Sequence, residues 1–381
     1  MLSGDPWVES RRFCLSVLRS FGVGKSSFEE QIAREARELI KEFSALDGKP
    51  FNSKFFLSNA VSNVICAIVF GERYEYDDAD FKRLLTIMQE NFRLFGSGGG
   101  LLYFPSLRYV PFIPIIGKLI SNYLEMRRFL TGVVNDHRAS FDAENIRDFI
   151  DVYLKEMKDT AEKDKVRAKR NEITEERFLG TVSDLFAAGT ETTATTLQWC
   201  LLYMIVYPDI QKRVQDEIDA VVGRNRLPRL ADKPELNFTR AVIWEVQRLT
   251  MIAPLGVAHA AASDIKFRGF VIPKGAFLFS NLWSVGRDPN IWQEPDEFKP
   301  ERFLNDKGEA VPREELIPFA IGRRSCLGEN LAKMELFVFF TYFMHQFTFK
   351  TLENSPPLSL EGVPGITYSS KPFELYAIKR D

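Results

Sequence analysis

The sequence predicts a mainly α-helical protein with a small β portion, and three observations support this fold class. Hydrophobic residues recur at helical spacing over most of the chain, whereas segments with strand-like alternation are few and short. Of the 381 residues, 45% are hydrophobic and 27% are charged, which is enough apolar material for a large core. No Gly/Ser linker, long charge run or internal repeat divides the sequence, so we expect one domain over residues 1–381.

The helical pattern is clearest in six segments of amphipathic or buried character. They are Ser27–Ser44, Phe81–Leu94, Ile115–His137, Ile173–Val206, Ile210–Val222 and Phe238–Thr250. Strand-like runs are confined to the second half of the chain. They are a short run after Pro254, then Asp264–Phe270, Ala276–Ser280, Phe347–Lys350 and Glu374–Ile378.

Composition excludes several classes of function. The formal net charge is −2, which argues against nucleic acid as the main partner. The four cysteines are widely separated and form no C-x-x-C pair, so a reducing compartment fits best. No run of 18 apolar residues and no signal-peptide core is present, and we expect the chain as given not to span a membrane.

The segment "LLYFPSLRYVPFIPIIG" (Leu101–Gly117) is apolar, but it is too short and too rich in proline to be a spanning helix. It is either a buried connection between two helices or a loop that dips into a membrane surface. Both interpretations remain open at this point.

The segment "PFAIGRRSCLGENLAKMELFVFF" (318–340) places a cysteine just before a strongly apolar helix that we expect to reach about His345. At a helix start, free backbone N–H groups and the helix dipole stabilise an anion, and Arg323 and Arg324 add positive charge. We therefore expect Cys326 to be a thiolate. The alternative is a small core residue, which is the common role of a lone cysteine.

The residues around the cysteine favour the functional alternative. Gly322 permits a sharp bend, Gly328 leaves space for a flat group at the helix start, and Phe319 can pack over the sulfur. The pattern Phe-x-x-Gly-x-Arg-x-Cys-x-Gly over residues 319–328 resembles the haem-binding loop of the cytochrome P450 family at every specified position. In that family a cysteine thiolate holds the haem iron. The resemblance implies that Cys326 is the iron ligand and that the cofactor is haem b.

The helix "FTRAVIWEVQRLT" carries Glu245 and Arg248 at i, i+3 spacing, where the two side chains can pair. Alone, such a pair is usually a solvated surface pair. Here "PERF" (Pro300–Phe303) follows at the distance typical of the family. The resemblance implies an interior cluster of Glu245, Arg248 and Arg302 with a structural role.

The segment "LFAAGTETTATTLQW" has five threonines and a glycine between Gly189 and Thr196, a poor composition for a helix centre. Broken local rules often mark a site, although a threonine-rich buried helix would give the same pattern. The segment resembles the family's oxygen-activation groove. That resemblance implies that Gly189 makes room for O₂ and that Glu191 and Thr192 relay protons.

Trp7 and Arg11 are spaced i, i+4, which places an indole N–H and a guanidinium on one helical face. Without other information, an aromatic residue and an arginine at this spacing would be interpreted as serving packing and solubility. The resemblance implies that both residues, together with Arg324, donate hydrogen bonds to the haem propionates. His259 in "PLGVAHA" matches a further propionate donor, and a surface histidine is its alternative.

The resemblance covers essentially the whole chain and is closest to the vertebrate microsomal second family. Because the sequence starts at the tryptophan helix, we expect the membrane anchor, the first helices and the early strands of the family to be absent. The resemblance also implies an apolar substrate pocket. Its expected wall residues are Phe186, Ala187, Thr190, Ile252, Leu255, Val257, Ile366 and Thr367.

These features together predict a haem-thiolate monooxygenase that oxidises lipophilic substrates, such as fatty acids or xenobiotics, with O₂ and NADPH-derived electrons. The implied partners are a flavoprotein reductase and, as a further candidate, cytochrome b5, at the cytoplasmic face of the endoplasmic reticulum. A basic surface for electron delivery would comprise Arg12, Arg19, Lys25, Arg323 and Lys333. The alternative is a shortened isoform that binds haem or partners without turnover. A haem-thiolate isomerase acting on peroxides is disfavoured because Glu191 and Thr192 supply a proton relay.

Overall fold

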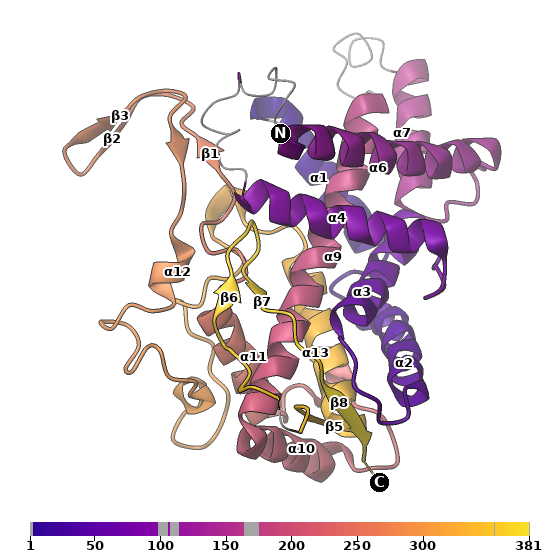
Figure 1. Ribbon diagram of the computed structural model, residues 1–381. Helices are drawn as coiled ribbons and strands as arrows, with labels where there is room; N and C mark the ends of the chain where they lie inside the picture. The colour runs from indigo at the N-terminus through magenta and orange to yellow at the C-terminus, as the bar shows by residue number, and fades with distance from the viewer. Residues whose placement is uncertain (1–2, 98–105, 107–113, 164–174, 354, 381) are drawn as a thin grey trace.

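The computed structural model describes residues 3–97, 106, 114–163, 175–353 and 355–380. Within them the chain is mainly helical with short strands, as the sequence predicts. Figure 1 shows the long helix α9 (Glu175–Val206) running through the middle of the molecule, with the N-terminal end of the chain near the top and the C-terminal end at the bottom.

The other described helices surround α9 (Figure 1). They are α1 (Gly4–Ser20), α2 (Glu29–Ala45), α3 (Lys54–Val69), α4 (Ala79–Ser97), α6 (Pro114–Ala139), α7 (Phe149–Lys163), α10 (Pro208–Val222), α11 (Asn237–Thr250), α12 (Leu282–Val285) and α13 (Glu329–Gln346). Short 3-10 turns are η1 (Ser26–Phe28), η3 (Leu230–Asp232), η4 (Pro300–Phe303) and η5 (Gly322–Arg324).

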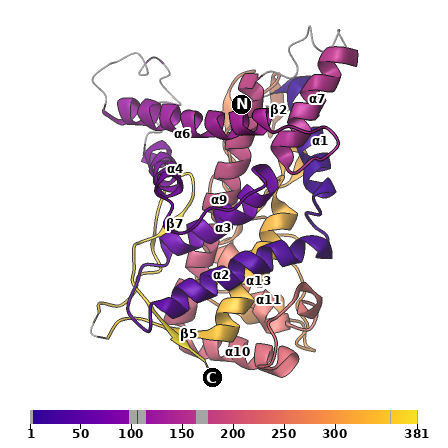
Figure 2. The same cartoon turned by 90° about the vertical axis from the view of Figure 1, so that its right-hand side faces the viewer.

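Helix α9 is buried on nearly all sides from Thr193 onward because other helices cover it. Helix α3 packs along one side of it and α13 along another, and Figure 2 shows α2 and α3 in front of α9 and α13. The threonines do not break the helix, because the Thr192 and Thr196 hydroxyls each donate 2.8 Å bonds to the carbonyl four residues earlier. The buried apolar residues of the described chain form one large cluster from α1 to the last strand, with a small satellite around Trp292 and Phe303.

Within the described residues the strands pair only in twos, and every pair is antiparallel. The pairs are β1 (His259–Ala260) with β4 (Phe277–Leu278), β2 (Ile265–Phe267) with β3 (Phe270–Ile272), β5 (Phe347–Lys350) with β8 (Tyr376–Lys379), and β6 (Gly362–Val363) with β7 (Ser369–Ser370). The β2–β3 hairpin projects from the body at the upper left of Figure 1.

The six predicted amphipathic helices are confirmed in the described residues, but α3, α7 and α12 are additions that the pattern did not predict. The sequence pattern did not predict helix α3, because 12 of its 16 residues are buried and no polar stripe marks a helical period. Its core includes polar residues such as Asn59 and Asn63, and the Asn63 side-chain N–H₂ donates to the Asn59 side-chain oxygen at 3.0 Å.

The predicted strand Asp264–Phe270 is wrong at its end, because the chain reverses within it. Arg268 and Gly269 both have positive φ, at 48° and 84°, which makes a two-residue hairpin turn. Phe270 therefore opens the returning strand β3, where it pairs with Phe267.

The apolar segment Leu101–Gly117 lies mostly outside the described residues, which include only Ser106 and its last four residues, the start of α6. None of the described helices has an apolar stretch of the length needed to cross a lipid bilayer.

Candidate functional site

A cleft opens where α9, the end of α11, the loop before Cys326 and the start of α13 meet. Threonine side chains of α9 form one wall, and apolar groups of the loop and of α13 form the other. The lining residues are Thr192, Thr193, Thr196, Gln247, Thr250, Ile252, Pro318, Phe319, Ala332 and Leu336. Three of the sequence-predicted site residues, Thr192, Ile252 and Phe319, are thus brought together here.

Cys326 lies on the loop at the edge of this cleft, and its side chain is exposed. The backbone N–H of Cys326 donates to the Phe319 carbonyl at 2.9 Å, which closes the loop onto the cleft-lining phenylalanine. Gly322 has φ of 81°, a conformation that favours glycine, so the bend expected there is present. A Cβ built on Gly328 would lie 4.0 Å from Cys326 Sγ, so glycine keeps the space beside the sulfur open.

The expected thiolate character of Cys326 is wrong for the protein alone. Surrounding protein atoms raise the pKa of the Cys326 thiol, and this desolvation outweighs the hydrogen bond from Gly328 at the helix start. The nearby Glu329 carboxylate also raises the pKa, whereas Arg11 lowers it. The helix start therefore lowers the pKa of the Cys326 thiol, as predicted, but its effect is smaller than that of desolvation. A coordinated metal ion deprotonates a bound thiol outright, so an iron ion would supply what the protein field does not.

Trp7 and Arg11, both on α1, lie beside the cysteine loop. The Arg324 guanidinium carbon lies 3.7 Å from the centroid of the Trp7 ring, and the Arg11 guanidinium carbon is 6.0 Å from it. Arg11 Nη2 donates a long bond of 3.5 Å to Ser325 Oγ, next to the cysteine. One indole N–H and two guanidinium groups are thereby gathered within a short distance of Cys326. His259 lies on β1 with an exposed side chain.

The acidic residue of the α9 motif faces away from the described cleft. Glu191 is only 2% exposed, its Oε1 accepts from Thr195 Oγ1 at 3.2 Å, and Lys54 Nζ of α3 is 3.9 Å away. Burial raises the pKa of Glu191 more than Lys54 and Thr195 lower it. Its Oε2 has no hydrogen-bond partner among the described residues.

Gly189 serves helix packing in this structure. A Cβ at this position would lie 2.6 Å from Ile65 Cδ1 of α3, so the absence of a side chain lets α3 and α9 approach closely. The space beside Gly189 is therefore filled by isoleucine. Its expected role in O₂ binding stays a prediction.

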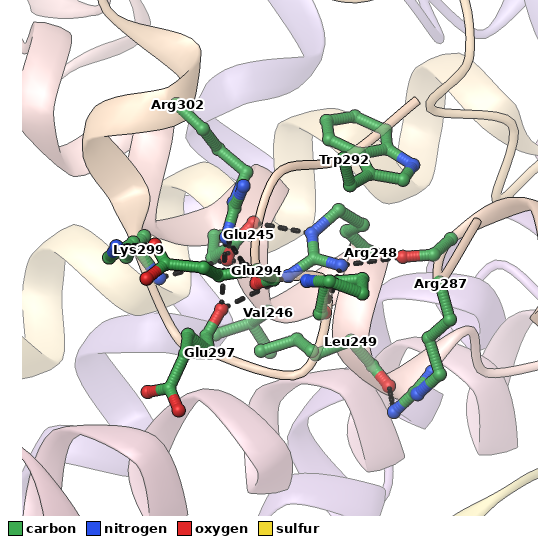
Figure 3. Close-up of polar contacts among 12 residues, drawn as sticks. Glu245, Val246, Arg248, Leu249, Arg287, Trp292, Glu294, Glu297, Lys299 and Arg302 are labelled. Carbon is green, nitrogen blue, oxygen red and sulfur yellow. Dashed lines mark hydrogen bonds and ion pairs between the residues drawn. The ribbon is translucent and has the colours of Figure 1, made fainter. Parts of the chain in front are cut away.

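Behind the cleft, the interior charge cluster has the expected members (Figure 3). Arg248 donates two bonds to the Glu245 carboxylate, at 2.7 and 2.8 Å, and Arg302 Nε donates a third at 2.9 Å. Arg248 and Glu245 are fully buried. Arg248 also donates to the carbonyls of Gly286, Pro295 and Glu297, so it holds a segment without regular structure in place.

Comparison with known proteins agrees with this geometry. The family model described as Cytochrome P450 matches residues 1–377. The chain belongs to the cytochrome P450 family. It is 41% identical to cytochrome P450 2U1 of Homo sapiens over 379 residues, which is 99% of this chain and 69% of that protein. It is 44% identical to cytochrome P450 2J2 of Homo sapiens over 382 residues (99% and 74%), and 42% identical to cytochrome P450 2D26 of Rattus norvegicus over 386 residues (99% and 75%).

Membership makes this chain a cytochrome P450 monooxygenase with haem b as its cofactor. Enzymes of the family take electrons from redox partners and act on lipophilic substrates. The haem supplies the O₂ chemistry. The residues present fit haem b, because a single soft thiol lies at the edge of a cleft and a cluster of N–H donors lies beside it, matching one iron and two carboxylates.

The other residues that were predicted to form the wall of the substrate pocket do not line the described cleft of this P450. Phe186 is fully buried and its ring is stacked on Phe70, with centroids 5.7 Å apart, so it belongs to the core. Ala187 also packs against the core, and Thr190 is fully buried with a hydroxyl that has no partner in the part of the chain that the structure describes. Thr367 is 5% exposed. Three others are exposed at the surface: Leu255 (50%), Val257 (58%) and Ile366 (40%).

Sequence reasoning missed four polar residues of the cleft: Thr193, Thr196, Gln247 and Thr250. The two threonines lie in the motif already singled out, and helical spacing from Thr192 would have placed Thr196 on the same face. Gln247 and Thr250 flank Arg248 on α11, and no local signal separates their face from the charge-cluster face.

Proposed function

We propose that this P450 hydroxylates or epoxidises lipophilic substrates such as fatty acids or xenobiotics, as a single haem domain over residues 1–381. Electrons would come from NADPH through a flavoprotein reductase, with cytochrome b5 as a second donor, at the cytoplasmic face of the endoplasmic reticulum. The observation that carries the proposal is the cleft, in which Thr192, Ile252 and Phe319 converge beside Cys326. Apolar walls with a few hydroxyl groups suit an apolar substrate.

Within this proposal, Cys326 binds the iron, and Trp7, Arg11 and Arg324 hold the propionates, with His259 as a fourth donor. Gly328 and Phe319 shape the space around the sulfur. Glu191, turned toward Lys54, would have to rotate to pass a proton to Thr192, whose hydroxyl now donates to the Ala188 carbonyl.

The first test is the carbon-monoxide difference spectrum of the reduced, purified protein. A thiolate-ligated iron gives a Soret band shifted far to long wavelength, and Cys326→Ala should abolish that band while keeping most of the helical content. Cys200→Ala, at a fully buried cysteine of α9, is the matched control and should retain the band. A shifted band that survives in Cys326→Ala would identify a different ligand.

The proton relay is tested separately with Thr192→Ala. Consumption of NADPH and O₂ should continue, but more of the O₂ should leave as peroxide because the hydroxyl beside the cleft is gone. Thr192→Ser, which keeps the hydroxyl, should stay close to the parent. Equal coupling of NADPH to product in all three proteins would contradict the role of Thr192.

Electron delivery would use the basic surface on the side of the cysteine loop. Its five proposed residues, Arg12, Arg19, Lys25, Arg323 and Lys333, are all exposed. Charge reversal at two of them should slow reductase-supported turnover and weaken its salt dependence. Unchanged salt dependence would remove the assignment of this surface.

A second candidate function, haem binding without turnover, is favoured by the exposure of Leu255, Val257 and Ile366, because a closed substrate pocket would bury them. Reductase-dependent product formation separates the two. A shifted carbonyl band without any product from fatty-acid or xenobiotic substrates would support this second candidate.

Membrane association is the last part of the proposal, with Leu101–Gly117 as the contact. An apolar loop that lies in the interface would bind reversibly, so the protein should sediment with microsomes and leave them after an alkaline wash. Resistance to the wash would contradict a peripheral mode of binding.

A further inference from the structure

Lys54 is the only charged residue of helix α3, and it lies at the first position of that helix. The helix dipole disfavours a cation at a helix start, and no acidic residue in the first turn of α3 offsets this effect. The backbone N–H of Lys54 donates to the Asn52 side-chain oxygen at 2.9 Å, which fixes the base of the side chain. A charge that is kept where local rules disfavour it indicates a partner elsewhere in the fold.

That partner is Glu191, on the helix that carries the threonines of the cleft. Lys54 Nζ lies 3.9 Å from Glu191 Oε1. The Lys54 side chain is 34% exposed, whereas the Glu191 side chain is 3% exposed. Helices α3 and α9 pack closely against each other. One lysine side chain therefore connects a nearly fully buried carboxyl group with the surface of the protein.

The Glu191 carboxyl has few other partners. The elements that pack against α9 are α3, α4, α6, α10, α11, α13, β5 and β7. Among their described residues, Lys54 is the only charged group that acts on the pKa of Glu191, and it opposes the rise caused by burial. Thr195 Oγ1 donates to Oε1 at 3.2 Å, and Oε2 has no partner among the described residues. Glu245, by contrast, accepts three short hydrogen bonds from arginine side chains.

We propose that Lys54 is a positioning residue whose ammonium group holds the Glu191 carboxyl on the α3 side of helix α9, away from the cleft, and links this buried acid to bulk water. The inference rests on the proposed proton relay from Glu191 to Thr192. At 3.9 Å the contact is an ion pair without a short hydrogen bond, so it attracts the carboxyl but leaves it free to rotate.

This arrangement gives the relay a source of protons. When Glu191 turns and passes its proton to the Thr192 hydroxyl, it becomes a carboxylate, and the Lys54 ammonium attracts that carboxylate back. Beside the partly exposed lysine, the carboxylate takes up a new proton from bulk water, and Lys54 keeps its own proton throughout. Each cycle therefore transfers one proton from the surface to the side of α9 that lines the cleft.

The first test is the stability of the haem-loaded protein against urea as a function of pH. Native Glu191 has a raised pKa, so it keeps a proton that the unfolded chain releases above about pH 4.3. Folding is therefore weakened as pH rises to the native pKa of Glu191, and is not weakened further above it. Lys54→Met removes the cation and raises that native pKa, so the loss of stability should continue to higher pH.

We expect the folding equilibrium constant of Lys54→Met, relative to that of the parent, to be at least about threefold lower at about pH 8 than at about pH 5.5. Lys54→Arg keeps the cation and should follow the parent. Lys49→Met, at an exposed lysine that precedes α3, is the matched control, and its ratio to the parent should be the same at both pH values.

Glu191→Gln identifies the group on which Lys54 acts. In that background Lys54→Met should change the folding equilibrium constant by the same factor at both pH values, because no carboxyl is left at position 191. If Lys54→Met alone does not fold, its combination with Glu191→Gln should restore folding. A pH dependence that persists with Glu191→Gln, a pH-independent effect of Lys54→Met alone, or failure of both proteins to fold would overturn the proposal.

Turnover separates this inference from the relay on which it rests. If Glu191 passes protons to Thr192, Glu191→Gln should increase the share of O₂ that leaves as peroxide. Lys54→Met should then move the pH dependence of that share to higher pH, and Lys54→Arg should not. An unchanged share in Glu191→Gln would contradict the relay alone. An increased share in Glu191→Gln, with an unmoved pH profile in Lys54→Met, would overturn the role of Lys54.

Discussion

The Arg324 guanidinium carbon lies 3.7 Å from the ring centroid of Trp7, which joins helix α1 to the turn that precedes Cys326. The two residues are more than 300 positions apart in the chain, so only the folded state brings them together. This contact favours a position of the guanidinium on one face of the indole. A group bound beside Cys326 would therefore meet donors that are already in position.

We expect Trp7→Ala to speed haem loss about fivefold, because a stacked cation on an aromatic ring contributes about 1 kcal/mol and its removal frees Arg324. The measurement is haem transfer from the purified protein to excess apomyoglobin. Trp7→Phe retains a ring but lacks the indole N–H. Its rate of haem loss should therefore lie between those of the parent and Trp7→Ala. Equal transfer rates for Trp7→Ala and the parent would show that the stacked pair does not hold the cofactor.

Replacing Glu245 with glutamine should reduce the free energy of unfolding by about 3–5 kcal/mol, because Arg248 would remain fully buried without its counter-charge. Urea denaturation followed by circular dichroism measures this change. Lys212→Gln, which removes an exposed ion pair with Asp216, is the control and should change the free energy by less than about 1 kcal/mol. Similar effects of the two variants would contradict the structural role of the cluster.

Gly189→Ala should destabilise the protein by about 1–3 kcal/mol, since the new Cβ would lie 2.6 Å from Ile65 Cδ1. Ile65→Val removes the closest atom of that side chain, so the alanine should be tolerated better when the two changes are combined. Denaturant unfolding of the parent, both single variants and the double variant measures the coupling. Strictly additive free energies would mean that Gly189 and Ile65 do not constrain each other.

A pH dependence is expected from His137, whose Nδ1 lies 2.8 Å from the Val133 carbonyl oxygen and whose Nε2 lies 2.9 Å from Asp148 Oδ2. Burial lowers the pKa of His137, but the Asp148 hydrogen bond and the Val133 carbonyl together outweigh it and raise the pKa overall. Of the other charged groups nearby, Arg147 opposes this rise, and Asp151 pairs with Arg147.

Because the native pKa of His137 is raised, the pair stabilises fully below the ordinary histidine pKa of about 6.5, and this stabilisation is lost as pH rises through the native value. The free energy of unfolding should therefore fall over that range, by less than about 1.4 kcal/mol per pH unit. His137→Gln should flatten this part of the profile when unfolding is measured from about pH 5.5 to 8.5. A parent profile that rises over the same range would contradict the ion pair.

The sequence allowed the amphipathic helices and the cysteine loop to be predicted, because both depend on local spacing. Helix α3 could not be found, since neighbours cover it on nearly all sides and its polar residues bond inside the core. The direction of the Cys326 pKa also escaped prediction. The helix start and the arginines are visible in the sequence, whereas the desolvation that outweighs them comes from the folded environment.

The sequence also could not predict the direction in which each side chain of a helix points. Phe186 and Thr192 lie in one motif, yet one packs on Phe70 in the core and the other lines the cleft. Glu191 follows the same rule, because its direction is set by Lys54 on another helix. Composition of the motif indicated a site, but the packing partners decide which of its side chains reach that site.

The contacts of Arg248 also bear on the order in which the chain assembles. Between Gly286 and Glu297 the backbone has no strand ladder, and its carbonyls of Gly286, Pro295 and Glu297 accept hydrogen bonds from this one side chain (Figure 3). Helix α11 can form from local contacts, whereas that segment has only short local turns of its own. Arg302 donates to further carbonyls of the segment, at Gln293, Glu294 and Glu297. We therefore expect the segment and α11 to unfold as one cooperative unit, in which buried arginine side chains hold the backbone as a neighbouring strand does in a sheet.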